Sequence, residues 1–116
     1  SYWSAFSVGD TIGVALDLDN NKIYFRVNGT YQNSGNPAAN SNGFSINDPA
    51  STANGFYFAV VGLVSGSRVA QLIYNFGSPP YSESGGNSDG NGYGNFAGSV
   101  PANYYSLNTK NIAEYG

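Results

Sequence analysis

The strongest constraint on the fold is an alternation of apolar with small or polar residues near the start of the chain. Every second residue is apolar at Ile12, Val14, Leu16 and Leu18, a period of two that is typical of a half-buried strand. After a polar turn, Lys22–Val27 alternates again and ends at Asn28-Gly29, the strongest short hairpin signal because it favours positive φ at both turn positions. With a short strand at Thr30–Gln32, residues 11–32 are predicted to form a three-stranded antiparallel meander.

A second hairpin is predicted at Phe56–Leu63 and Arg68–Phe76, which are rich in β-branched and aromatic residues. We expect both strands to be mostly buried. The aromatic residues predicted to lie in the core are Phe25, Phe56, Phe58 and Phe76. No segment shows convincing helical periodicity, and short strands with Gly-rich turns favour an all-β antiparallel sandwich over an α/β fold.

Two long connections are predicted, at 33–55 and 82–98. The first is rich in Asn, Ser, Ala, Gly and Pro, with Phe44 and Ile46 as its large apolar residues. The second is nearly all Gly, Asn, Ser and Asp, a composition in which glycine entropy disfavours helix. The end of the chain regains aromatic residues and should pack back on the strands. A length of 116 residues predicts a single domain, 1–116.

The charge pattern excludes several functions. Only 9% of residues are charged, and the cations are scattered along the chain at Lys22, Arg26, Arg68 and Lys110. Nucleic acid is therefore not expected as a partner, because nothing here forms a basic patch for phosphates.

No apolar run approaches the ~18 residues of a spanning helix, so no membrane insertion is expected. The chain has no Cys, hence no disulfide framework and no thiolate zinc site.

Catalysis is not expected either. The chain has no His and no Cys, which removes the commonest general base and the commonest soft nucleophile. Glycosidases on related sandwiches use clustered carboxylates. The nearest arrangement here is Asp17-Leu18-Asp19, which lies at a turn where Asp is favoured for turn geometry alone. The prediction is a protein that is not an enzyme and needs no cofactor.

Two stretches have the alternating oxygen ligands of a calcium loop. Asp17, Asp19 and Asn21 form one, and Asp89, Asn91, Tyr93 and Asn95 form the other. Neither ends in the bidentate Glu of such loops, and turn chemistry in Asx-rich loops is the favoured explanation for both stretches. No metal site is predicted.

A binding surface is predicted where Tyr lies in or beside loops rich in Asn, Ser and Gly. Tyr offers contact area with few rotatable bonds, and the small polar residues offer hydrogen bonds. Sugar-binding loops have the same composition, and for any one ring the alternative is a cap at the end of the strands. The candidate ligand-binding residues are Tyr31, Tyr81, Asp89, Asn91, Tyr93, Asn95 and Tyr104.

Several stretches carry a family pattern. They are Gly9–Asp19 with Lys22–Phe25 and Val27-Asn28-Gly29, then Gly55–Val60, and finally Tyr74–Gly77. Together they resemble the C-terminal two-thirds of a SPRY domain, a concanavalin-like sandwich. The end of the chain, Asp89–Phe96 and Pro101–Gly116, is similar to the close of SPRY-like modules in tailed-phage virion and tail-fibre proteins.

The resemblance implies a jelly-roll sandwich that is truncated at the N-terminus, because the family's first strands would precede Gly9. The chain is then expected to be a fragment of a longer one. Strand edges at Thr11–Leu18 or Arg68–Phe76 should be bordered by other protein. Trp3 and Phe6 are expected near that junction.

The resemblance also implies a non-catalytic binding or assembly module in a virion structural or tail-fibre protein, located on the virion or outside the cell. The expected partners are neighbouring virion chains or a homo-oligomer, together with a host-surface glycan or protein. Scarce Lys and Glu are typical of such surfaces. Two alternatives stay open, because fold alone does not define function: a cellular SPRY domain that recognises peptides, and a lectin-like domain that binds polysaccharide.

Overall fold

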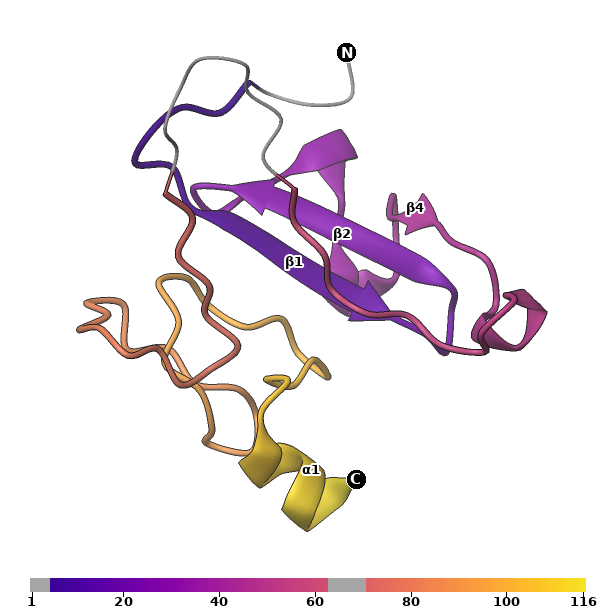
Figure 1. Cartoon of the computed structure of the whole chain (residues 1–116). Coiled ribbons are helices and arrows are strands. Elements are labelled where there is room, and N and C mark those ends of the chain that lie inside the picture. Colours follow the sequence, from indigo (N-terminus) through magenta and orange to yellow (C-terminus); the bar gives the residue numbers. More distant parts are fainter. Residues whose placement is uncertain (1–4, 63–70) are drawn as a thin grey trace.

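The computed structural model describes residues 5–62 and 71–116. In these residues the chain is mostly β, with one antiparallel sheet and one short helix (Figure 1). The elements in chain order are β1 (Ile12–Asp17), β2 (Lys22–Val27), β3 (Thr30–Tyr31), η1 (Gln32–Ser34), η2 (Pro37–Ala39), β4 (Phe44–Ser45), η3 (Pro49–Ser51) and α1 (Thr109–Tyr115).

The predicted meander is confirmed. β1 and β2 pair from Ile12↔Val27 to Asp17↔Lys22, and β3 continues along β2. The turn has φ of 48° at Asn28 and 85° at Gly29, the left-handed values that an Asn-Gly hairpin supplies. The Asn28 side chain also accepts a hydrogen bond from the backbone N–H of Thr11 at 2.9 Å, so the turn is tied to the residue just before β1.

The 33–55 connection is largely irregular, as predicted, but it returns to the sheet once. β4 pairs with β2 through Lys22↔Ser45 and Ile23↔Phe44. The rest is built from short polar caps: the Asn36 side chain accepts from the N–H of Ala39 at the start of η2. Positive φ values also occur at asparagines in this connection, which tolerate the left-handed region better than most residues.

The sheet buries the face that the sequence marks as more polar. Tyr24 is 1% exposed and lies directly opposite the buried Ala15. A Cβ on Gly43 would lie 2.6 Å from the Tyr24 ring, so this part of the connection packs against the ring at glycine. The ring edge also meets Tyr104, with centroids 6.4 Å apart.

The opposite face, which carries the alternating aliphatic residues of β1, is open along β1, although Val27 of β2 is buried on it. Val14 is 61% exposed, and Ile12 and Leu16 are exposed as well. Phe25, predicted to lie in the core, is half-buried on the same face.

The prediction of a second hairpin is wrong for its described residues. Residues 56–62 and 71–76 form no strand. Phe58 is 71% exposed, and Phe56 and Phe76 are exposed rather than in the core. β-Branched and aromatic sequence forms a strand only when a neighbour pairs with its backbone, and no described strand does so here. The predicted hairpin turn, and Trp3, lie outside the described residues, while Phe6 is exposed.

The sequence shows no convincing helical periodicity, yet one short helix, α1, closes the chain, so the fold is mostly β rather than all-β. Asn108 caps this helix by accepting from the backbone N–H of Asn111 at 2.9 Å, a standard role for Asn. The helix has only 7 residues, too few for a periodic pattern to identify. No helix within residues 5–62 and 71–116 has the length and apolarity needed to cross a membrane.

The C-terminal part of the chain packs against the buried face of the sheet, as expected. Arg26 on β2 donates to the backbone oxygen of Ser99 at 2.7 Å. The predicted connection 82–98 is irregular and is closed by one bridge, Asn87↔Phe96. Figure 1 shows this part in orange and yellow below the sheet, with α1 at its far end.

Candidate functional site

The carboxylate of Asp89 organises the C-terminal part of the chain. Asp89 is 7% exposed. Its Oδ1 accepts from the backbone N–H groups of Asn91 and Tyr93, both at 3.0 Å. Its Oδ2 accepts from the N–H of Ser106 at 2.8 Å, from the Ser106 hydroxyl at 2.8 Å and from Asn111 Nδ2 at 2.6 Å. One side chain therefore joins the 82–98 loop to α1.

Local sequence explains the loop side of this arrangement. Asp89 and Tyr93 close a tight turn in which the Asp89 N–H donates to the Tyr93 oxygen at 2.7 Å and the Gly92 N–H donates to the Asp89 oxygen at 3.0 Å. Gly92 has φ of 80°, a value that glycine adopts without strain. The turn aims two N–H groups at the carboxylate, which is the usual behaviour of Asp in loops.

The buried charge is stabilised by donors rather than by a cation. Ser106 and Asn111 are buried beside Asp89. Burial alone would raise the pKa of the Asp89 carboxyl, but hydrogen bonds from Ser106, Tyr93 and Asn111 outweigh it and hold that pKa well below its usual range. Hydrogen bonds to an ionised group are about twice as strong as neutral ones.

The same bonds explain the calcium-like spacing around Asp89. A metal would need the oxygen lone pairs that N–H and O–H donors already occupy. Asp17 has a similar role at the turn after β1, where it accepts from the N–H and the Nδ2 of Asn20, both at 2.9 Å. No group of three or more acidic, His or Cys side chains in the described part of the chain could hold a metal ion.

Tyr93 connects the loop to α1 at the surface. Its hydroxyl donates to Glu114 Oε2 at 2.6 Å, and Lys110 Nζ lies over its ring, 5.1 Å from the centroid. The hydrogen bond to Glu114 raises the pKa of Tyr93 to about 12.

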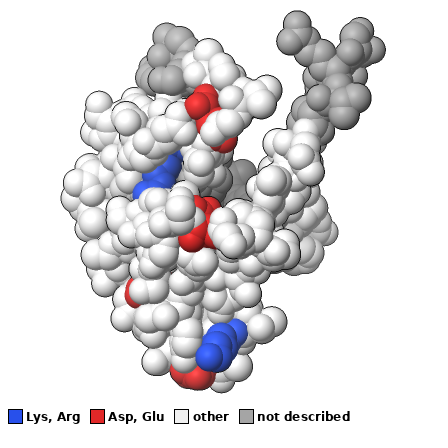
Figure 2. All heavy atoms as spheres, turned by 90° about the vertical axis from the view of Figure 1, so that its left-hand side faces the viewer, with Lys and Arg blue, Asp and Glu red and all other residues white. Residues whose placement is uncertain are grey.

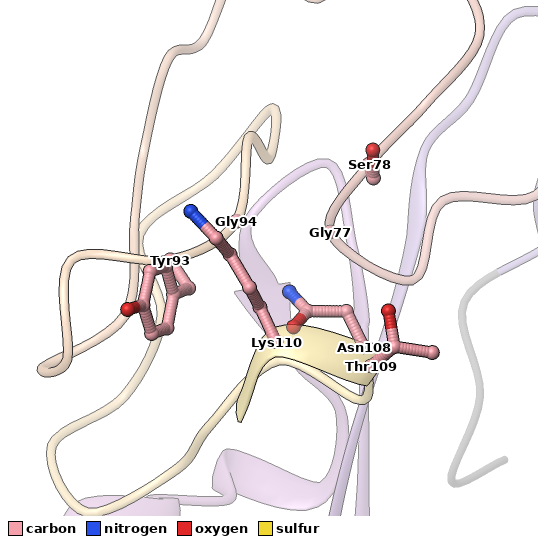
Figure 3. Close-up of a pocket in the computed structure, with 7 residues that line it drawn as sticks. All are labelled: Gly77, Ser78, Tyr93, Gly94, Asn108, Thr109 and Lys110. Carbon is pink, nitrogen blue, oxygen red and sulfur yellow. The ribbon is translucent and has the colours of Figure 1, made fainter. Parts of the chain in front are cut away.

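A shallow hollow of about 220 Å³ lies beside Tyr93. Figure 3 shows the Lys110 side chain rising from the start of α1 between Tyr93 and the Gly77-Ser78 segment. The lining residues are Gly77, Ser78, Tyr93, Gly94, Asn108, Thr109 and Lys110. This set offers hydroxyl, amide and ammonium groups but no carboxylate, imidazole or thiol. It can hold a small polar group.

The seven predicted binding residues do not form one surface. Asp89, Asn91 and Tyr93 are brought together, since Asn91 Nδ2 donates to Asn111 Oδ1 at 2.9 Å next to Asp89. Asn95 is half-buried, and its backbone oxygen accepts from Asn75 at 2.7 Å.

The other three predicted residues lie apart. Tyr31 lies on β3, where its ring faces the Arg26 guanidinium at 5.7 Å. Tyr104 packs on Tyr24, where burial and the nearby carboxylate of Asp17 raise the pKa of the Tyr104 phenol above its usual range. Tyr81 is exposed and takes part in neither the Tyr31–Arg26 contact nor the Tyr104–Tyr24 contact.

Sequence reasoning missed the C-terminal half of the Asp89 network. Ser106, Asn108 and Asn111 supply its donors and cap α1. The sequence signal that could have identified α1 was Asn108 at the N-cap position, followed by a short run of helix formers. No such signal links Ser106 and Asn111 to Asp89, because they lie far from it in the sequence.

Charged groups are sparse on the face shown in Figure 2, where Lys, Arg, Asp and Glu form isolated patches among uncharged atoms. No family model, no curated protein and no solved structure matches the chain. Its function therefore has to be inferred from its own residues.

Proposed function

We propose that the chain is a non-catalytic, SPRY-like β-sandwich module that assembles with neighbouring protein chains in a tailed-phage virion, as a structural or tail-fibre component. The observation that carries the assembly function is the open aliphatic face of β1, formed by Ile12, Val14 and Leu16. A contiguous row of apolar side chains that is exposed to water is typical of a surface that binds another protein.

The same face supports the sandwich architecture. A sheet with one apolar face is stable when a second layer covers that face. Phe56, Phe58 and Phe76 are exposed aromatic residues outside the sheet and would also gain from a second layer. The free energy available is about 25 cal/mol for each Å² of apolar surface removed from water.

The geometry around the carboxylates supports a non-catalytic role. Asp17 and Asp89 accept hydrogen bonds that fix turns, and the pKa of each is lowered rather than raised towards neutrality. A general acid at neutral pH needs a raised carboxyl pKa. The expected result is no hydrolysis of peptides, esters or β-glucans, and turnover that disappears in the Asp17→Asn variant would contradict this part of the proposal.

The virion assignment rests on the likeness of the chain's C-terminal stretch to phage modules and on the sparse charge of the surface. Its test is direct: antibodies against the chain should label intact phage particles, on the tail or the capsid, and mass spectrometry of purified particles should detect it. A chain that is expressed during infection but absent from purified particles would contradict the virion assignment.

One observation favours a lectin-like activity as the second candidate. The hollow beside Tyr93 combines an aromatic ring with the hydroxyls of Ser78 and Thr109, groups that commonly orient small polar ligands. Titration with host envelope polysaccharide tests it. Binding that is lost in Tyr93→Ala but kept in Tyr81→Ala, a control outside the hollow, would support this candidate; equal binding by both variants would exclude it.

A further inference from the structure

The outer edge of β1 is unpaired by any described strand. β2 has β1 on one side and both β3 and β4 on the other. β1 is therefore the edge of the sheet, and an edge strand offers its free N–H and C=O groups to another strand.

The ladder shows which backbone groups are free. The N–H of Asn28 donates to the oxygen of Thr11 at 2.9 Å, and the pairing continues in register through Ala15↔Tyr24. Hydrogen-bonded pairs alternate along an antiparallel ladder. Gly13 and Ala15 thus bond to β2, while the N–H and C=O of Ile12, Val14 and Leu16 point outwards.

The same three residues carry the exposed aliphatic side chains of β1. Natural edge strands are usually blocked by Lys, by Pro or by a bulge. β1 has neither Lys nor Pro, and its register with β2 is continuous. Its only charge, Asp17, stands at the end of the strand. β1 thus has none of the usual features that prevent strand addition.

We propose that this edge pairs with the same edge of a second copy of the chain, antiparallel and about a two-fold axis, with Val14 opposite Val14 of the second copy. This inference rests on the proposed assembly function and identifies the partner as a second copy of the chain. The pairing joins the sheets of the two copies into one sheet with a continuous apolar face.

The second copy is the occupant that this edge fits best. In a two-fold pairing centred on Val14, Ile12 lies opposite Leu16 of the second copy, so all the outward backbone groups find partners. Shifting the register by two residues leaves some of them unpaired. The centred register also places Asp17 opposite Thr11 of the second copy, so the two carboxylates stay apart. Such an interface uses one patch twice, as two-fold dimers do.

Cysteine cross-linking tests the register, because the chain has no cysteine of its own. Hydrogen-bonded cross-strand pairs have Cα atoms about 5.5 Å apart, within the usual disulfide range. We expect Val14→Cys to form a disulfide-linked dimer on oxidation. Ile12→Cys and Leu16→Cys should each stay unlinked when alone and should form a mixed dimer together.

The control is Ala53→Cys, at an exposed residue outside the sheet. The amount of disulfide-linked dimer that this variant forms gives the level of cross-linking by random collision. Cross-linking of Val14→Cys at or below that level overturns the proposal. A charge swap gives an independent readout: Val14→Lys should weaken dimerisation roughly tenfold through like charges placed opposite each other. Mixing Val14→Lys with Val14→Glu should restore it. Failure of the mixture to dimerise also overturns the proposal.

Cross-linking in intact particles separates this inference from the proposed function. If the chain is present in virions but Val14→Cys does not link copies there or in solution, the pairing is wrong and the virion assignment stands. If the purified chain links through Val14→Cys but particles lack it, the pairing stands and the virion assignment is wrong.

Discussion

Replacing Asp89 by Asn keeps the size of the side chain and removes its charge and one acceptor oxygen. The amide can keep its oxygen on one side of the network only. If it faces Asn91 and Tyr93, its NH2 group meets the N–H and hydroxyl of Ser106 and the Nδ2 of Asn111, which are all placed to donate. If it is flipped, the two loop N–H groups lose their acceptor.

At least two hydrogen bonds to a charged acceptor are therefore lost. Each contributes about 1.5–3 kcal/mol, which gives a loss of about 3–6 kcal/mol in the free energy of unfolding. That is a large part of the ~5–15 kcal/mol of an ordinary domain. We expect the connection between the 82–98 loop and α1 to open in the Asp89→Asn variant.

Urea denaturation measures the global loss, and amide hydrogen exchange at Tyr93 and Ser106 measures the local one. Asp48→Asn is the matched control, because Asp48 is exposed and caps only η3 through the N–H of Ala50. Its expected cost is below about 1 kcal/mol. The reasoning is refuted if Asp89→Asn costs no more than this control and leaves both amides protected.

The remaining predictions concern pH, the turn, the faces of the sheet and Tyr93. The folded-state pKa of Asp89 lies below its ordinary value of 3.8, so its contribution to stability should be present above that pH and lost as the pH falls below it; acid denaturation that is unchanged in Asp89→Asn would contradict this. Gly29→Val should cost about 1–2 kcal/mol, measured by thermal melting, because φ is positive there although a Cβ meets open space. Tyr24→Ala should cost about 3–5 kcal/mol and Val14→Ala below about 0.5 kcal/mol in the monomer, and the reverse order would show that the faces are wrongly assigned. Spectroscopic titration should give Tyr93 a pKa of about 12 that returns towards 10.0 in Glu114→Gln.

The sequence predicts the meander well because its signals are local. The alternation through β1 and β2 and the Asn28-Gly29 turn need no information from elsewhere in the chain. Which face is buried cannot be read from that alternation. It depends on Gly43 and Tyr104, which meet Tyr24 from distant parts of the chain.

The errors of prediction have the same physical origin. Phe56 and Phe58 have strand-forming composition, yet a strand needs a paired neighbour, which composition does not provide. The Asx spacing identified Asp89 as important but predicted that it binds a ligand, whereas its carboxylate accepts hydrogen bonds from within the chain. Its donors Ser106 and Asn111 lie 17 and 22 residues further along the chain, and no local pattern connects them to Asp89.

Amide hydrogen exchange along β1 tests the central claim most directly, whichever chain covers the edge. Gly13 and Ala15 bond to β2 and should exchange slowly at every concentration. The amide of Val14 should exchange quickly in dilute monomer and become protected in the assembled protein, both in concentrated solution and in particles. A Val14 amide that exchanges equally fast in the dilute and the assembled protein would contradict the account of β1 as an assembly edge.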